Sequence, residues 1–390
     1  MAKVLKKIGS FLLKALKETG PFLLKSFKKF LKSQLVIPVV ALVALLAFDF
    51  IFFNLIKGTD FFSVTLEKNN NGDPALQGNI ISILNNASEL VILAIGMTLV
   101  TASSRGQDIS VGAEAAIAGS VFVSVLLANE ITWPIIIVAF LACCVVAVLC
   151  GAFNGTLVAV FKIQPMIATL ILFTAGRDVA YMINGGATPT VASPLLGYIG
   201  SFIPGVPIPT PIIIVIIFVV LISLVLRFTN LRLYTQSVGI NEKSARLNGI
   251  NAIWIKLLSF MILGVCVAVS GSVYVSRMGL INHSTSFWGI EMDAILAVAI
   301  GGNSLSGGKF SLAGSIMGAY IIHTLTVTLL AMKVPSNAII FYKAIAIIVI
   351  VVVLSPIVKK YVFQLRDFLF KKPTKDKLLK TDENNGEQIL

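Results

Sequence analysis

PIIIVIIFVVLISLVLRFT, residues 211–229, is apolar except for Ser223, Arg227 and Thr229, and Arg227 near its end is its one charged residue. A helix of about 20 apolar residues is long enough to cross the hydrocarbon core of a bilayer, which is roughly 30 Å thick. A helix on the surface of a soluble protein does not need so long an uninterrupted run, because one of its faces stays polar toward water. We therefore predict that this stretch is a transmembrane helix.

Apolar runs of the same kind recur through the chain. Its 390 residues are 57% hydrophobic and 13% charged, and the mean hydropathy is +0.93. The pattern predicts an all-α polytopic membrane protein with about ten transmembrane helices, of which the eighth is short or broken. The runs lie at 35–56, 80–102, 109–129, 134–160, 163–183, 211–229, 255–275, 290–303, 312–332 and 338–358.

Positive charge gathers at the ends of the chain and between the apolar runs, giving a net charge of +13. Residues 1–34 carry nine lysines and one acid, with leucines at helical spacing, which is typical of a basic amphipathic segment on a membrane surface. Such lysines hold a segment in the cytoplasm, and ten spans return residues 359–390 to the same side. We predict a transmembrane domain at 35–358, a cytoplasmic, partly disordered tail, and no nucleic-acid partner.

The loop at 230–254 follows the sixth run and is therefore cytoplasmic in this topology. It contains GINEKSARLNGIN at 239–251, where we expect a short helix between flexible ends at Gly239 and Gly249. A connector between two spans needs only about four to six residues. The extra length favours a partner that docks on this loop, and a solvated connector is the alternative.

Residues that carry chemistry are few. The four cysteines fall inside apolar runs, and His283 and His323 belong to no metal-binding motif, so we expect no metal. NSLSGGKF at 303–310 lacks the first glycine of a phosphate-binding loop and the Ser or Thr that follows its lysine. We therefore expect no nucleotide site, no cofactor and no enzyme activity in this chain.

Four stretches, in order, resemble the membrane subunits of bacterial ABC importers for simple sugars, the ribose, xylose and galactose permease family. Together they cover most of residues 80–355. The stretches are GMTLVTASSRGQDISVGAEAAIAG at 96–119, GAFNGTLVAVFKIQPMIATLILFTAGRDVAYMINGG at 151–186, QSVGINEKSARLNGIN at 236–251 and DAILAVAIGGNSLSGGKFSLAGSIMGA at 293–319.

The resemblance implies a type II importer fold, in which spans 2–5 and 7–10 form halves of inverted orientation. It implies a subunit that passes a simple sugar across the bacterial cytoplasmic membrane. Its partners are an ATP-binding subunit, an extracytoplasmic sugar-binding protein and a second permease, which is an identical copy or a paralogue. By the same resemblance, the residues that dock on the ATP-binding subunit are Gly239, Asn241, Glu242, Ala245, Arg246, Leu247 and Gly249.

Polar and aromatic residues at membrane depth are candidates for the translocation path, because a polar group there is costly unless it faces a cavity or a partner. A neutral sugar needs hydrogen-bonding partners and an aromatic wall, to which Trp288 is a further candidate. Helix packing is the alternative role for each of these residues. The candidates are Asn85, Glu89, Asp108, Asn154, Phe173, Arg177, Asp178 and Tyr181.

The chain departs from the family pattern at two places. It has Ser104-Arg105-Gly106-Gln107 where many members have a glycine pair, and Arg177-Asp178 where they commonly have Arg-Gly. Two other transport functions stay open: an ABC permease for a nucleoside or a branched-chain amino acid, and an ion-coupled secondary carrier that uses Glu89, Arg177 and Asp178 as relays.

Overall fold

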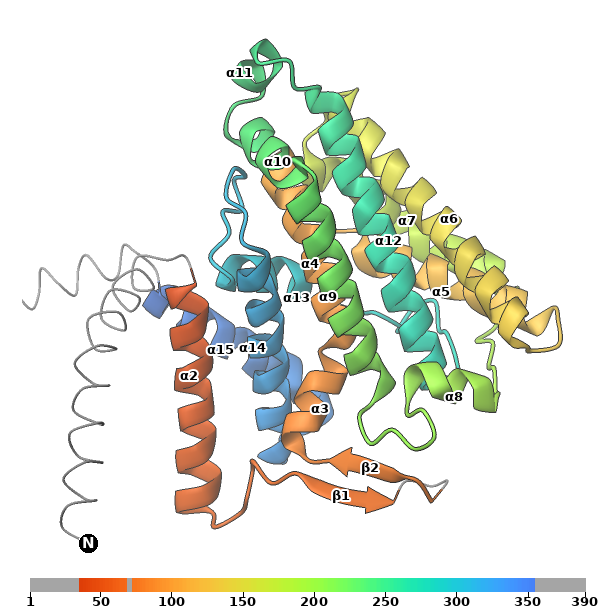
Figure 1. Ribbon diagram of the computed structural model, residues 1–390, viewed down its shortest axis with the longest axis vertical. Helices are drawn as coiled ribbons and strands as arrows, with labels where there is room; N and C mark the ends of the chain where they lie inside the picture. The colour runs from red at the N-terminus through yellow and green to blue at the C-terminus, as the bar shows by residue number, and fades with distance from the viewer. Residues whose placement is uncertain (1–34, 69–71, 355–390) are drawn as a thin grey trace, which may run out of the picture. The chain divides into compact units, whose positions relative to one another are not determined.

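The computed structural model describes residues 35–68 and 72–354 and is mostly helical (Figure 1). The expected surface helix at 1–34 and the tail at 359–390 lie outside the described residues. The chain divides into two compact units, one that ends at Pro335 and one that begins at Ser336. Each unit is described by itself.

The first unit holds the helices up to α14 and a two-stranded hairpin, and the second holds α15. The elements are α2 (Val36–Asp49), the π-helical η1 (Phe50–Ile56), β1 (Thr65–Lys68), β2 (Pro74–Gln77), α3 (Asn79–Asn86), α4 (Ser88–Ser104), α5 (Val111–Leu127), α6 (Trp133–Ala159), α7 (Pro165–Ile183), α8 (Pro194–Gly200), α9 (Thr210–Phe228), α10 (Leu231–Ile240), α11 (Glu242–Leu247), α12 (Ala252–Met278), α13 (Ile290–Ile300), α14 (Leu312–Ala331) and α15 (Ser336–Leu354).

Among the described residues, six helical segments are long and apolar enough to cross a membrane, and a seventh is formed if α3 and α4, bent by 42° at Ala87, count as one span. The six are α2 with η1, α6, α7, α9, α12 and α14. The chain is thus a polytopic helical membrane protein. Helix α13 has only 11 residues, as expected of the short eighth run, and the total of ten spans stays a prediction.

Proline and capping residues determine where several helices begin. Pro134, Pro165 and Pro211 occupy the first turns of α6, α7 and α9, where a missing backbone N–H has no cost. Ser311 begins α14 by accepting a hydrogen bond from the Gly314 N–H at 3.2 Å. These local signals place the helix boundaries close to the ends of the apolar runs.

Helix α4 is the centre of the first unit, since all 17 of its residues are buried. Helix α12 has 27 residues and packs along both α4 and α6 (Figure 1). A small residue makes this approach close, because a Cβ at Gly264 of α12 would lie 2.4 Å from the carbonyl oxygen of Ala147 in α6. Helices α4 and α12 therefore form a packed pair through the core.

Strands β1 and β2 pair antiparallel in the segment that precedes α3, with Thr65 opposite Gln77. The hairpin is tied to the loop before α9 by a hydrogen bond from the Leu76 N–H to the Pro207 carbonyl at 2.8 Å. This segment is the long polar insertion between the first two apolar runs.

Candidate functional site

The expected short helix lies in the loop between α9 and α12. The extended residue Asn241 caps it, because its side chain accepts a hydrogen bond from the Ser244 N–H at 3.1 Å. Helix α11 ends before Asn248, and Gly249 follows in a left-handed conformation with φ of 79°. The six residues of α11 are thus set between α10 and α12 by their own capping chemistry.

Gly239 is buried in the last turn of α10, so our expectation of a flexible end at this position was wrong. A Cβ at Gly239 would lie 1.8 Å from the carbonyl oxygen of Ala102, near the end of α4. The same carbonyl accepts a hydrogen bond from the Gly308 N–H at 3.1 Å. Only glycine allows the backbones of α10, α4 and the 301–311 turn to approach so closely.

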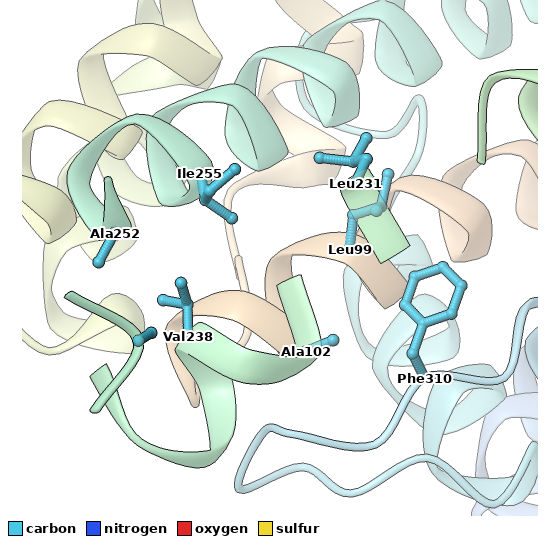
Figure 2. Close-up of a cluster of buried hydrophobic side chains, with 8 residues drawn as sticks. Leu99, Ala102, Leu231, Val238, Ala252, Ile255 and Phe310 are labelled. Atoms are coloured by element: carbon cyan, nitrogen blue, oxygen red, sulfur yellow. The ribbon is translucent and has the colours of Figure 1, made fainter. Parts of the chain in front are cut away.

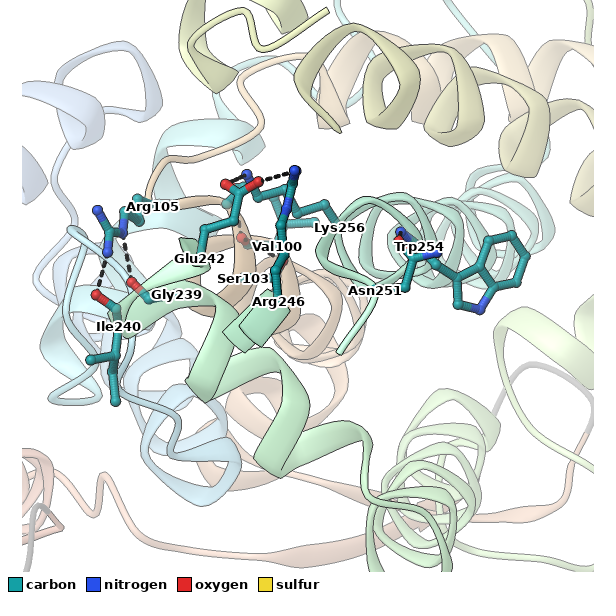
Figure 3. Close-up of polar contacts among 11 residues, drawn as sticks. Val100, Ser103, Arg105, Gly239, Ile240, Glu242, Arg246, Asn251, Trp254 and Lys256 are labelled. Atoms are coloured by element: carbon teal, nitrogen blue, oxygen red, sulfur yellow. Dashed lines mark hydrogen bonds and ion pairs between the residues drawn. The ribbon is translucent and has the colours of Figure 1, made fainter. Parts of the chain in front are cut away.

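Arg105 fastens the end of α10 to the end of α4 (Figure 3). Its Nε donates to the carbonyl of Gly239 at 2.6 Å, and its Nη2 donates to the carbonyl of Ile240. The last carbonyls of a helix have no partner within the helix and carry partial negative charge, which a guanidinium satisfies. Arg105 therefore makes its described side-chain hydrogen bonds to the end of α10.

A hydrophobic cluster lies beneath this segment and joins it to α4 and α12 (Figure 2). Its members come from four helices and from the loop before α14: Leu99, Ala102, Leu231, Val238, Ala245, Ala252, Ile255 and Phe310. Ala245 is only 4% exposed, so it packs into the protein and lies beneath the surface, as Gly239 does. Of the residues expected to dock on a partner, Gly239 and Ala245 therefore pack inside the protein and hold the loop against α4 and α12.

Glu242 ties α11 to α12. Its Oε1 lies 2.6 Å from Nη2 of Arg246, and its Oε2 lies 2.6 Å from Nζ of Lys256 (Figure 3). Partial burial acts to raise the pKa of Glu242, but the hydrogen bond and charge of Lys256, followed by those of Arg246, hold the pKa below its usual value. The carboxylate is therefore ionised at neutral pH.

The outer surface of α11 is basic and has an apolar tip. Leu247 is 89% exposed, and Lys243, Arg246 and Asn248 are exposed beside it. An exposed large apolar side chain within a ring of polar groups is typical of a contact surface for another protein.

A second group of polar residues lies at the opposite ends of α4 and α12. Nη2 of Arg277 on α12 is 3.2 Å from Oε1 of Glu89 on α4 and 2.9 Å from the carbonyl oxygen of Asn85. Nη1 of Arg277 donates to Oδ1 of Asn86 at 3.3 Å. Glu89 is only 5% exposed, so Arg277 neutralises a buried charge.

These residues line a pocket of about 310 Å³. Glu89, Arg277 and Asn86 form its polar side, and the rings of Tyr274, Phe287 and Trp288 form an aromatic side. Within the described chain, Oε1 of Glu89 and Nε of Arg277 are buried and make no hydrogen bond. Oε1 of Glu89 still lies in the ion pair with Nη2 of Arg277, so the pocket places a charged pair beside an aromatic wall. The other lining residues are Leu90, Met278, Thr285, Ile290, Asp293 and His323.

Two predicted path residues on α7, Arg177 and Tyr181, contact the loop that carries Trp288 and do not themselves line the pocket. The guanidinium of Arg177 lies 5.2 Å from the ring centroid of Trp288, and Nη1 of Arg177 donates to the carbonyls of His283 and Ser286 at 2.9 and 3.1 Å. The ring of Tyr181 meets that of His283 edge-on at 4.8 Å. Arg177 thus fixes the loop that carries Trp288.

Other predicted path residues lie elsewhere. Asp178 is exposed and Phe173 is half-buried on α7. Asp108 and Asn154 are fully buried with Ser110 and Glu114: Nδ2 of Asn154 donates to Glu114 at 2.7 Å and to Ser110 at 2.9 Å, and Ser110 donates to Asp108 at 2.5 Å. This network joins α5 to α6, and neither Asp108 nor Asn154 lines the pocket at Glu89. The structure brings only part of the predicted set together.

Arg277 and Tyr274 are the residues that sequence reasoning missed. An arginine at the end of a 27-residue apolar helix is itself a signal, because an ionisable group near membrane depth needs a partner. Its partner, Glu89, is 188 positions earlier in the chain, which no local pattern reveals.

Residues 79–354 match the family model described as "Branched-chain amino acid transport system / permease component". The chain belongs to this permease family. The match includes both ends of α4 and α12, so it covers the loop at α11 and the pocket at Glu89. The family resemblance identified from the four sequence stretches is confirmed.

Three relatives of the permease have names that refer to sugar transport. It is 39% identical over 284 residues to the galactofuranose transporter permease protein YtfT of Escherichia coli K12, covering 73% of this chain and 81% of the relative. It is 35% identical to the fructose import permease protein FruF of Bifidobacterium longum, over 84% and 90% of the two chains. It is 34% identical to the ribose import permease protein RbsC of Escherichia coli K12, over 70% and 85%. No solved structure matches the permease.

Family membership makes the permease a multi-pass protein of the inner membrane. Permeases of this family work with an ATP-binding subunit and a binding protein.

Proposed function

We propose that the permease is the membrane subunit of an ATP-driven importer for a simple sugar. The observation that carries the proposal is the pocket at Glu89 and Arg277, where their ion pair lies beside Trp288. The relatives named for galactofuranose, fructose and ribose support the same substrate class.

The pocket has the chemistry that a sugar requires. A sugar hydroxyl is both a donor and an acceptor, so it suits a wall that carries the Glu89 carboxylate and the Arg277 guanidinium side by side. Aromatic faces such as those of Tyr274 and Trp288 provide apolar contact for the ring carbons. A volume of about 310 Å³ lies at the small end of the range for small-molecule sites, which is roughly 300–1,000 Å³. The site therefore favours a monosaccharide over a larger ligand.

Two helices connect this pocket to the loop at α11. Helix α12 carries Lys256, bonded to Glu242, near one end and Arg277 near the other. These residues are about 30 Å apart along the helix, at about 1.5 Å for each residue. Helix α4 likewise carries Ala102 at its α10 end and Glu89 at its pocket end. Because packed helices move as rigid elements, displacement of α11 reaches both sides of the pocket.

In the proposed importer, the ATP-binding subunit contacts the exposed surface of α11 formed by Lys243, Arg246 and Leu247. Asn241 and Gly249 set the ends of this surface, Glu242 orients it, and Gly239 and Ala245 support it from beneath.

The proposed orientation places the α11 loop in the cytoplasm and the pocket at Glu89 on the outer side of the membrane, where a sugar-binding protein delivers its ligand. A second permease, identical or paralogous, completes the path along the exposed face of α7 that carries Phe173, Asp178 and Tyr181.

Ten spans, with both chain ends in the cytoplasm, are part of the proposal. Each of the ten apolar runs coincides with a helix or with a pair of consecutive helices, which supports this count. The proposed domains at 1–34 and 359–390 lie outside the described residues. The network at Asp108 and Asn154 supports a packing role for these two residues at the inner end of the path.

The test is sugar uptake into right-side-out membrane vesicles that contain the permease, its ATP-binding subunit and its binding protein. We expect ATP-dependent uptake of one or more of galactofuranose, fructose and ribose. Glu89→Gln should lower that uptake at least tenfold, because the charged acceptor is lost. Glu130→Gln, which removes an exposed acid in the loop after α5, is the matched control and should retain uptake.

Two results would redirect the proposal. ATP-dependent uptake of a nucleoside or branched-chain amino acid, with no uptake of the sugars, would assign the other ABC substrate class. Uptake that persists without the ATP-binding subunit and stops when the proton gradient is dissipated would assign an ion-coupled carrier.

A further inference from the structure

A second and larger pocket, of about 680 Å³, lies where α9 ends and where α10 and α14 begin. Arg227 comes from the last turn of α9 and Arg232 from the first turn of α10. Ser223, Gln236 and Ser311 add polar groups to the wall. The lining residues include no Asp or Glu, so the pocket carries two positive charges that no acid in its wall offsets.

Neither arginine forms an ion pair within the part of the chain that the structure describes. Arg227 is exposed there and makes no hydrogen bond to a described residue. Arg232 is exposed too, and its guanidinium lies 5.8 Å from the ring centroid of Phe310. The first turn of α14, with Leu312 and Ala313, also borders the pocket and adds the positive end of the helix dipole. All of these charges favour an anion.

The walls of the pocket are amphipathic. Leu226, Phe310 and Leu312 line it together with the arginines. Helix α9 leads away from it with an exposed and mostly apolar face that includes Ile217 and Leu224. In a membrane-spanning helix, the change from this face to Arg227 marks the boundary between the hydrocarbon and the headgroups. A ligand that fits has a negative head and an apolar body.

We propose that this pocket binds the phosphate headgroup of an anionic membrane lipid in the cytoplasmic leaflet. Basic pockets between transmembrane helices at this level suit such headgroups, and Arg offers paired donors that match phosphate oxygens. The assignment to the cytoplasmic leaflet rests on the proposed orientation of the importer.

Lipid binding here has a consequence for coupling. Arg232 and Gln236 lie on α10, and the last turn of the same helix is held by Arg105 and pressed against Ala102. A headgroup that bridges Arg227 and Arg232 fixes α10 to the end of α9. Anionic lipid is therefore expected to raise the fraction of sugar-stimulated ATP hydrolysis that is coupled to uptake.

The experiment uses the full-length permease in nanodiscs that contain phosphatidylcholine with increasing phosphatidylglycerol, and native mass spectrometry counts the retained lipids. We expect retention of phosphatidylglycerol over phosphatidylcholine. R227Q/R232Q should weaken this preference about 25-fold, at about fivefold for each basic side chain near a membrane surface. R227K/R232K keeps the charge and should retain most of the preference, which separates charge loss from misfolding.

The matched control is K57Q/K333Q. Lys57 and Lys333 are exposed and follow the far ends of η1 and α14, about 30 Å from the pocket by helix length. This variant removes the same number of charges and should leave lipid retention unchanged. Equal loss in both double variants, or no preference in the wild type, would overturn the proposal.

A further arm distinguishes the source of the phosphate. Inorganic phosphate at millimolar concentration should not displace the retained lipid, because the apolar walls hold the acyl chains. Displacement by phosphate would overturn the lipid assignment in favour of a free-anion site. The measurement needs neither ATP nor sugar, so its result is independent of whether the permease carries a sugar.

Discussion

Arg277 near the end of α12 lies 3.2 Å from Glu89 near the start of α4, measured from Nη2 to Oε1. This ion pair joins the two central helices at the pocket, while Arg105 and Lys256 join the same helices to the α10–α11 loop at their other ends. Two parts of the protein about 30 Å apart are therefore linked by two packed helices.

Removing Arg277 should destabilise the permease as well as stop transport. Arg277→Gln leaves the 5%-exposed Glu89 without its counter-charge, and breaking a buried pair in this way costs about 3–5 kcal/mol. Thermal unfolding in detergent should therefore occur at a lower temperature. The double variant E89Q/R277Q should recover most of the stability but not the uptake. Uptake restored in the double variant would contradict a role for these charges in the path.

A methyl group at Gly239 should separate α10 from α4. The Cβ of Gly239→Ala would overlap the Ala102 carbonyl, so the two helix ends must move apart and the Arg105 contact is weakened. We expect sugar-stimulated ATPase activity to fall at least fivefold in the reconstituted complex. Gly197→Ala is the control, because a Cβ there meets nothing within 4 Å. Equal activity of the two variants would show that this close approach is not needed for coupling.

The double variant E242A/R246A tests the contact surface of α11. It removes both contacts of Glu242 and one exposed positive charge. Uptake and sugar-stimulated ATPase activity should both fall, whereas sugar capture by the binding protein should stay unchanged, since that protein lies on the other side of the membrane. Normal uptake by this variant in membranes would count against the coupling role.

Exposure along α11 predicts which positions can be cross-linked to the ATP-binding subunit. Leu247→Cys places a thiol at a position that is 89% exposed, and Ala245→Cys places one at a position that is 4% exposed. Cross-linking followed by mass spectrometry should join the ATP-binding subunit to Cys at 247 but not at 245. Cross-links from position 245 alone would contradict this prediction, because α11 would have to rotate about its axis in the complex to expose that position.

The ion pairs of Glu242 give α11 a defined pH dependence. The folded pKa of Glu242 lies below its ordinary value of 4.5, so the stabilisation is complete above that value and is lost as the pH falls through the folded pKa. A spin label at Lys243→Cys should keep the same mobility from pH 7 down to pH 4.5 and become more mobile only as the pH falls further, through the lowered pKa of Glu242. With Glu242→Gln, the label should be mobile throughout. A transition near neutral pH in the wild type would contradict this assignment.

The sequence by itself determined the helical membrane fold, because an apolar run of about 20 residues is stable as a helix in the hydrocarbon core of a bilayer and is unfavourable in water. It also located α11 between Gly239 and Gly249, of which Gly249 follows the helix as a local signal for its end. The sequence did not predict which residues of this loop are buried. Six residues are too few for a periodic pattern to show that Ala245 faces inward, and nothing local shows that Gly239 touches α4.

Only the tertiary structure decided which polar residues meet. Asn85 and Glu89 join Arg277 at the pocket, whereas Asp108 and Asn154 join Ser110 and Glu114 between α5 and α6. A polar residue in an apolar run shows that some partner exists, because an isolated buried charge is too costly. Which partner it has depends on how helices far apart in the chain pack side by side, and that packing is decided by contacts between helix faces rather than by any single stretch of sequence.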